Sequence, residues 1–221
     1  MNIKLEAVIF DMDGLMLDTE RLSIPSMRVA SKAIGINITD NTLIELIGLN
    51  ENDSNAFLEK RLGKPIDWEK FSAAFYQDYL RALTNGGIRL KEGLIELINF
   101  LKENNLRLAV ATSTKTDLAL KKLRLAGILN QFEIVIGSDQ VAQGKPAPDI
   151  YLKAATELGV NINNCLALED SDNGALSAFR AGIKVIVVPD IKAPSRTTQR
   201  IASNICGSLS EAKKLILNEL S

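Results

Sequence analysis

Two acids one residue apart end an apolar segment near the start of the chain. The stretch "AVIFDMDGLMLDTE" places Asp11 and Asp13 directly after four apolar residues and just before Gly14. Residues two apart in a strand point to the same side, so both carboxylates can face one crevice. Such a pair repels itself unless a cation or a shared proton intervenes. It indicates acid–base chemistry beside a cation, although a bare Asp-x-Asp can also open a solvated turn.

Polar residues follow three later apolar segments as well. They are Thr112, Ser113 and Thr114 after "RLAVA", Lys145 in "QGKPAPD", and Glu169 and Asp170 after "LAL". Each group alone has an ordinary explanation, such as a helix cap or an exposed charge. Together they supply acids for a hard cation, a nucleophile, and donors for phosphate oxygens. If the segments are parallel strands, these groups gather at one sheet edge as a site for phosphoryl transfer.

The elements that must position these residues alternate along the chain. Short apolar runs occupy residues 7–10, 107–111, 132–137, 165–168 and 185–188, and amphipathic helical patterns separate the later runs. This alternation predicts an α/β fold with a doubly wound parallel sheet. Because the runs are almost entirely apolar, we expect helices to cover both faces of the sheet.

One region lacks strand patterns. From residue 17 to residue 83 the sequence reads as successive amphipathic helices, and it returns through "TNGGIRL" at residues 84–90. We therefore predict a catalytic α/β core formed by residues 1–16 and 86–221, with a helical cap, residues 17–85, inserted after the first strand.

Composition excludes several classes of function. The chain has 221 residues, a formal net charge of −1 and no histidine. The missing histidine excludes Ser-His-Asp and Cys-His catalysis and histidine-ligated zinc, which leaves carboxylates, hydroxyls, lysines or a hard metal ion. Cys165 and Cys206 are far apart and indicate two ordinary thiols. Without a basic field or an apolar leader, we expect a cytoplasmic protein that binds neither nucleic acid nor membrane.

Four motifs in order carry a resemblance to a known family. The segments "DMDGLMLDTE", "VATST", "GKPAPDIY" and "LALEDSDNGALSAFRAG" resemble those of the haloacid dehalogenase superfamily of phosphohydrolases, in the branch of beta-phosphoglucomutase and sugar-phosphate phosphatases. The resemblance covers essentially the whole chain. It implies an Mg²⁺ cofactor and a small phosphorylated metabolite as substrate, and we expect the chain to act as a monomer.

The resemblance also implies roles for the catalytic residues. Asp11 corresponds to the nucleophile that forms an aspartyl-phosphate, and Asp13 to the acid and base that serves the leaving and attacking oxygens. Thr112 and Lys145 correspond to the phosphate-binding pair. Covalent catalysis of this kind divides one hard hydrolysis into two easier steps.

Further residues are implied as ligands of the metal or the substrate. The implied magnesium ligands are four acids: Asp11, Asp13 through its backbone carbonyl, Glu169 and Asp170. Ser113 and Thr114 join Thr112 and Lys145 as substrate contacts. Glu20 is a further candidate for substrate binding, although a solvated helix start explains it as well.

Several reactions are compatible with a chain that resembles this family. Dehalogenases of this family lack the second acid, so Asp13 indicates a phosphoryl-transfer enzyme. Beta-phosphoglucomutases carry a cap histidine and a cap arginine where this chain has Ser23 and Glu51. A carboxylate at the second position would repel a phosphate, so we favour a phosphatase acting on a sugar phosphate over a sugar-phosphate mutase. A non-enzymatic phospho-acceptor domain is a third interpretation, but such domains are shorter and lack the helical insertion.

Overall fold

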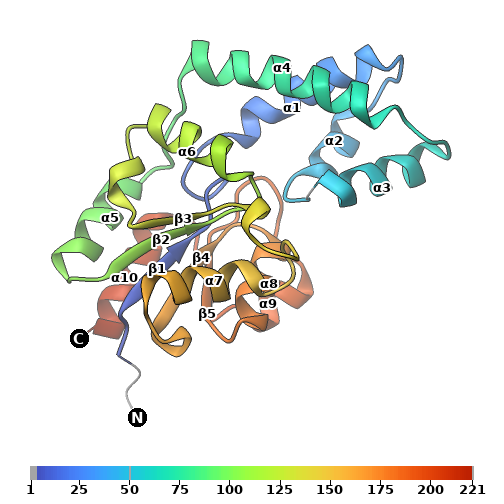
Figure 1. The fold of residues 1–221 in the computed structure, drawn as a ribbon. Helices are drawn as coiled ribbons and strands as arrows, with labels where there is room; N and C mark the ends of the chain where they lie inside the picture. Colours follow the sequence, from blue (N-terminus) through green and yellow to red (C-terminus); the bar gives the residue numbers. More distant parts are fainter. Residues whose placement is uncertain (1–3, 50, 221) are drawn as a thin grey trace.

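A parallel sheet lies at the centre of the computed structural model, which describes residues 4–49 and 51–220 (Figure 1). Its strands run in the order β3-β2-β1-β4-β5-β6. Their bounds are β1 Ala7–Phe10, β2 Arg107–Ala111, β3 Ile134–Ile136, β4 Cys165–Glu169, β5 Lys184–Val187 and β6 Asn204–Ile205. Every residue of β1 is buried, because this strand lies between β2 and β4. The predicted parallel α/β fold is confirmed.

Helices cover both faces of the sheet, as the apolar strands predict. On the face of Val8 and Phe10 lie α5 (Leu94–Glu103), α6 (Thr116–Leu125) and α10 (Leu209–Leu220). On the face of Ala7 and Ile9 lie α7 (Asp149–Leu158) and α8 (Asp172–Arg180), and α9 (Arg196–Ile201) packs against α8. Alternate residues of β1 therefore belong to two separate hydrophobic clusters, as the two-residue period of a strand requires.

Four helices lie together beyond one end of the sheet and are called the cap helices here (Figure 1). They are α1 (Glu20–Ala33), α2 (Asp40–Leu46), α3 (Glu51–Leu62) and α4 (Trp68–Gly86). They have a hydrophobic cluster of their own, which includes Leu43, Leu58 and Phe71. The sequence patterns predicted helices in this region, and among its described residues no strand of the sheet occurs.

The structure differs from the sequence patterns in three places. Helix α4 continues through Thr84 to Gly86, so the expected return loop begins with a helical turn. The sequence analysis identified neither β6, which has two residues, nor α9, which has six. It also left out α10, whose apolar face packs against α5. Within the described ranges, none of the helices combines the length and the apolar character that crossing a bilayer requires.

Candidate active site

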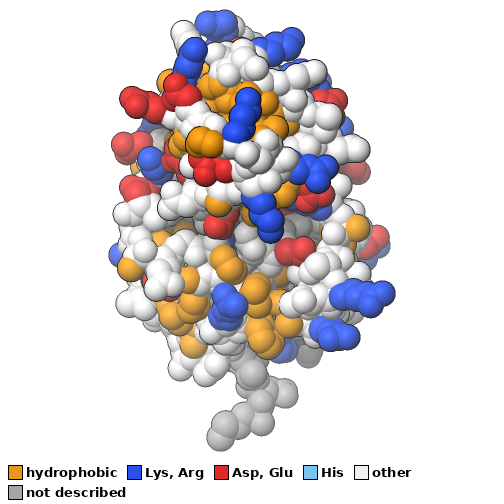
Figure 2. Space-filling model, turned by 90° about the vertical axis from the view of Figure 1, so that its right-hand side faces the viewer, with side chains coloured by type: hydrophobic (Ala, Val, Ile, Leu, Met, Phe, Trp, Pro, Cys, Tyr) orange, Lys and Arg blue, Asp and Glu red, His pale blue; other side chains and the backbone are white. Residues whose placement is uncertain are grey.

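The predicted catalytic and ligand-binding residues lie together at the carboxyl ends of the strands, below the cap helices. A cavity of about 990 Å³ lies there, lined by residues of the cap helices, of α6 and of the loops that follow β1, β2, β3 and β4. Lys192, in the segment between β5 and α9, connects the sheet domain to the cap, because its Nζ donates to the backbone carbonyls of Glu45 (2.9 Å) and Ile47 (3.0 Å) at the end of α2. Figure 2 shows a face on which acidic and basic side chains stand on both sides of the boundary between the cap helices and the sheet.

The turn after β1 explains the glycine that follows the two acids. Gly14 has a φ of +83°, in the left-handed region that favours glycine, and its N–H donates to the carbonyl of Leu17 at 3.0 Å. A Cβ at this position would collide with the carboxylate of Asp170. Gly14 therefore lets the chain turn away toward the cap while the acid after β4 approaches the turn.

Lys145 is a buried cation at the centre of the site. Its Nζ lies 2.5 Å from Oδ1 of Asp11 and 2.6 Å from Oε1 of Glu169, and it donates to the carbonyl of Ala111 at 2.8 Å. Only 4% of Lys145 is exposed. Burial alone would lower its pKa, but the two carboxylates raise the pKa above its usual value, so the ammonium stays charged.

Glu169 is completely buried beneath the site. Besides Lys145, it accepts a hydrogen bond of 2.6 Å from the hydroxyl of Tyr151. Gly174 on α8 makes room for it, since a Cβ there would collide with the Glu169 carboxylate. Glu169 therefore holds the Lys145 ammonium group in place.

Three carboxylates form a group with the geometry of a metal site. Oxygens of Asp11, Glu169 and Asp170 all lie within 4.8 Å of one another. Burial raises the pKa of Asp11 to about 8, and burial followed by the charge of Asp11 raises the pKa of Asp170 well above its usual value. Clustered carboxylates with this unfavourable electrostatic environment fit a divalent cation, and carboxylate oxygens are the ligands that Mg²⁺ prefers.

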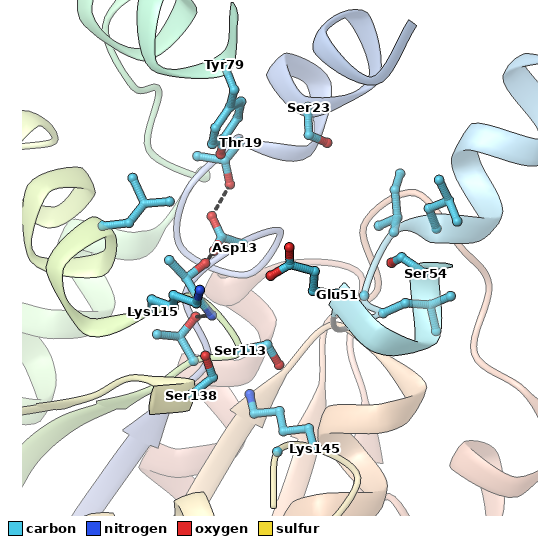
Figure 3. Close-up of a pocket in the computed structure, with 18 of the residues that line it drawn as sticks. Asp13, Thr19, Ser23, Glu51, Ser54, Tyr79, Ser113, Lys115, Ser138 and Lys145 are labelled. Carbon is cyan, nitrogen blue, oxygen red and sulfur yellow. Dashed lines mark hydrogen bonds between the residues drawn. The ribbon is translucent and has the colours of Figure 1, made fainter. Parts of the chain in front are cut away.

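Asp13 has a separate set of partners. Its Oδ1 accepts from Thr19 at 2.5 Å and from Lys122 at 2.8 Å, and its Oδ2 accepts from Thr114 at 2.7 Å (Figure 3). Burial opposes the charge of Asp13, but Lys122 and the three hydrogen bonds lower its pKa. The two acids of the opening motif thus lie in different electrostatic environments.

The hydroxyl residues after β2 divide into three positions. Thr112 is buried, and its Oγ1 accepts from the N–H of Thr114 at 3.1 Å, which holds the loop closed over the end of β2. Ser113 is exposed and lines the cavity, where Figure 3 shows it between Lys115 and Lys145. Thr114 lines the cavity and contacts Asp13.

The cap helices contribute acids to the same cavity. Glu20, Ser23 and Glu51 all line it, and the carboxylate of Glu51 projects into it (Figure 3). Burial, followed by the charge of Asp13, raises the pKa of Glu20 to about 7. Oγ of Ser23 donates to the carboxylate of Glu20 at 3.2 Å. The structure therefore brings together all the residues that the sequence analysis selected.

Sequence reasoning missed Lys122, Thr19, Tyr79 and Tyr151. Lys122 is 3% exposed and lies on the buried face of α6 beside Ala119 and Leu123. A lysine on the apolar face of a helical pattern could have indicated a buried cation with an acidic partner. Its Nζ also lies 5.1 Å from the ring centroid of Tyr79 on α4, so it contacts both the acid and a cap helix.

Comparisons with known proteins agree with this site. A family model described as haloacid dehalogenase-like hydrolase matches residues 8–188. The chain is 34% identical over 184 residues to a phosphorylated carbohydrates phosphatase of Thermotoga maritima, covering 82% of this chain and 84% of that protein.

Among the solved structures that share the fold are the following two. One is CbbY from Rhodobacter sphaeroides in complex with phosphate, with a TM-score of 0.77 and 28% identity over 94% of this chain and 96% of that one. The other is a beta-phosphoglucomutase from Clostridium difficile, with a TM-score of 0.83 and 22% identity over 98% of this chain and 97% of that one. At the lower identity the likeness concerns the fold alone.

Proposed function

Since this chain belongs to the haloacid dehalogenase-like hydrolase family, we propose that it is a magnesium-dependent phosphatase. Its proposed substrate is a small phosphorylated carbohydrate. It acts through an aspartyl-phosphate on Asp11. One observation carries the proposal: Asp11 and Asp13 belong to one turn but have different partners. Asp11 lies beside Lys145, a cation placed to attract phosphate oxygens, while Asp13 is held apart from it by its own donors.

The reaction divides into two steps. In the first, a carboxylate oxygen of Asp11 attacks phosphorus, the ester P–O bond breaks, and Asp13 gives a proton to the leaving oxygen. When the dianionic phosphoryl group of the substrate enters beside Asp13, its negative charge favours the protonated form of the Asp13 carboxyl, which this step needs. In the second, Asp13 takes a proton from water as the water attacks phosphorus, and the P–O bond to Asp11 breaks. Inorganic phosphate leaves and the Asp11 carboxylate is restored.

Other residues of this chain bind and orient the phosphoryl group. Lys145, fixed by Glu169, supplies positive charge, and the loop of residues 112–114 supplies hydroxyls and N–H donors. Asp11 and Asp170, with Glu169 beside them, are the residues that would hold Mg²⁺. The ion, when bound, would neutralise charge between these acids and the phosphate oxygens.

Water is the acceptor that the cap residues favour. A mutase needs a positive cap group to bind a second phosphate, and among the described residues the cap side of the cavity contributes neither Lys nor Arg. It contributes the carboxylates of Glu20 and Glu51 instead. The alternative is a beta-phosphoglucomutase-type mutase; an enzyme of that name shares the fold, but the fold alone does not favour it, and these residues favour hydrolysis.

The test is release of inorganic phosphate from a panel of phosphate esters with and without Mg²⁺. The panel includes p-nitrophenyl phosphate, ribose 5-phosphate, glucose 6-phosphate and phosphoglycolate. We expect magnesium-dependent turnover of sugar phosphates. A single phosphoryl group transferred per chain, without turnover, would instead identify a phospho-acceptor and refute the proposal.

A further inference from the structure

Helix α4 presents a row of aromatic side chains to the cavity. The row consists of Trp68, Phe71, Phe75, Tyr76 and Tyr79, which recur at helical spacing and all line the cavity; it is called the aromatic row here. It contains the only tryptophan of the chain, two of its three tyrosines and two of its seven phenylalanines. Five of the eleven aromatic residues of the chain therefore lie on one helix, where a bound substrate would meet the cap.

Part of the aromatic row packs in the core, and part remains accessible. Phe71 and Tyr79 are buried, at 3% and 4% exposure. Trp68, Phe75 and Tyr76 are half-buried and line the cavity, and Trp68 and Phe75 also pack against the hydrophobic cluster of the cap. Trp68 stacks on Phe71 with ring centroids 5.1 Å apart, and Phe75 stacks on Tyr79 at 5.2 Å. These contacts hold the rings in place before a ligand binds. Binding therefore loses less side-chain conformational entropy.

The aromatic row begins beside the reacting groups and leads away from them. Tyr79 lies 5.1 Å from Nζ of Lys122, which contacts Asp13. Trp68 lies eleven residues earlier on the same helix, about 16 Å along its axis at 1.5 Å per residue. A phosphate held near Asp11 and Lys145 would therefore leave the rest of a substrate alongside Tyr76 and Phe75.

Among the described residues, the cations that line the cavity all lie on its sheet side, where aspartates stand beside them. They are Lys115, Lys121, Lys122 and Lys145. The described residues of the cap side supply the carboxylates of Glu20, Glu51 and Asp53 and neither Lys nor Arg. Glu51 is tied to the aromatic row, because Nε1 of Trp68 donates to its Oε1 at 3.1 Å. The wall that faces the leaving group thus combines flat apolar rings with negative charge.

From this arrangement we infer that the substrate is a phosphate monoester whose leaving group carries a flat unsaturated ring and no second anionic group, a class in which nucleoside 5′-monophosphates are the simplest members. The inference rests on the proposed phosphatase function and narrows it. The sheet side binds the phosphoryl group, the sugar spans the cavity, and the base lies against the aromatic row. A second phosphate would meet Glu51, which disfavours bisphosphates.

The first experiment measures kcat/KM for adenosine 5′-monophosphate and for ribose 5-phosphate, which share the reacting phosphate and the sugar. Stacking of the base predicts a ratio of roughly tenfold or more in favour of the nucleotide. Phe75→Leu keeps an apolar side chain but removes a ring of the aromatic row, so most of that ratio should disappear. Phe57→Leu is the matched control, because Phe57 packs in the cap without lining this cavity. Equal rates for the two esters in the wild type would overturn the inference.

The second experiment tests the negative wall with adenosine 5′-monophosphate and adenosine 3′,5′-bisphosphate. We expect the bisphosphate to bind worse, and Glu51→Gln to recover its binding by roughly two- to fivefold. Glu69→Gln, at an exposed acid of α4 outside the cavity, should change nothing. A bisphosphate that binds as well as the monophosphate would refute the inference.

Failure of the inference and failure of the proposed function give different results. If ribose 5-phosphate is hydrolysed with no advantage for the nucleotide, only the inference is refuted. If no ester releases phosphate, p-nitrophenyl phosphate included, the phosphatase function fails and the inference with it. Fluorescence of Trp68 gives a readout without turnover: in Asp11→Asn, the nucleotide should change this signal far more than ribose 5-phosphate, and equal responses would count against stacking.

Discussion

Nζ of Lys122 lies 2.8 Å from Oδ1 of Asp13 below the cap helices, where the Lys122 side chain is 4% exposed and the Asp13 side chain is 19% exposed. The same ammonium group lies 5.1 Å from the ring centroid of Tyr79. One side chain of the sheet domain therefore contacts the proposed acid–base residue and a cap helix together. Its effect on Asp13 is to fix the position of the carboxylate, together with Thr19, whose hydroxyl donates to the same Oδ1.

The first prediction is that Lys122→Met lowers kcat by about ten- to a hundredfold and changes KM much less. A displaced carboxylate slows proton transfer, and small misplacements of reacting groups are known to cost up to about a hundredfold. Steady-state kinetics on one sugar phosphate measure the effect. Arg124→Met removes an exposed cation from the same helix and should have normal kinetics. Wild-type kcat in Lys122→Met would remove Lys122 from the mechanism.

A loss of folding is distinguished from a loss of positioning by a double variant. Removing one partner of a buried ion pair typically costs about 3–5 kcal/mol, because the other charge stays buried and unpaired. Lys122→Met combined with Asp13→Asn removes both charges, so its free energy of unfolding should exceed that of Lys122→Met alone. It should nevertheless remain inactive, since the acid–base group is gone.

The second prediction concerns the nucleophile. Asp11→Asn keeps the shape of the side chain but removes the charge that attacks phosphorus, so turnover should fall by several orders of magnitude. Thermal unfolding should show that the variant is folded. Asp149→Asn, at the first turn of α7, serves as the matched control. Phosphate release near the wild-type rate by a folded Asp11→Asn protein would exclude Asp11 as the nucleophile.

The third prediction is that Mg²⁺ raises thermal stability and that Asp170→Ala largely abolishes this effect. The ion should bind where Asp11, Glu169 and Asp170 lie together, and that arrangement exists only in the folded state. A ligand at a hundredfold excess over its dissociation constant stabilises the folded state by about 2.7 kcal/mol. Thermal unfolding with increasing Mg²⁺ measures the shift. An equal shift in both proteins would place the ion elsewhere.

The fourth prediction is a pH dependence of stability due to Glu20. Burial raises its pKa in the folded protein from 4.5 to about 7, so the folded state favours the neutral carboxyl. The contribution of the neutral Glu20 carboxyl to the free energy of unfolding is fully present below pH 4.5 and is lost as the pH rises through 7. Glu20→Gln should therefore be more stable than the wild type by about 1–3 kcal/mol at pH 8 and about equal to it at pH 4.

Denaturant unfolding without Mg²⁺ at the two pH values measures this difference. Glu96→Gln, at an exposed position of α5, is the control and should track the wild type at both. If the advantage of Glu20→Gln were the same at pH 4 and pH 8, the ionisation of Glu20 would not be its cause.

The sequence predicted the residues that the sheet itself positions. Asp11, Thr112 and Asp170 follow strands that are neighbours in a parallel sheet, so recognising the strands was enough to bring these residues together. It did not predict Lys122 as a partner of Asp13. The helical pattern shows a lysine on an apolar face, but which carboxylate it reaches depends on how α6 and α4 pack above the sheet.

The same reason explains what the sequence left open in the cap. Periodicity predicted its helices, because each buries an apolar face. It gave no indication that the aromatic row of α4 lines the cavity, since aromatic residues at helical spacing are equally typical of a hydrophobic core. The missed strand β6 has two exposed residues and is defined by pairing with β5 rather than by a pattern of its own.

The last prediction concerns the phosphoryl acceptor. A sugar-phosphate mutase must retain a bisphosphorylated intermediate, which needs a cation in the cap for the distal phosphate and a means of favouring a sugar hydroxyl over water. Here Ser23 and Glu51 line the cavity from the cap side, and a carboxylate repels the distal phosphate. With β-glucose 1-phosphate, Mg²⁺ and a trace of glucose 1,6-bisphosphate, any turnover should therefore release inorganic phosphate with little glucose 6-phosphate. Glucose 6-phosphate forming much faster than free phosphate would identify a mutase and show that the acids of the cap do not exclude a second phosphate.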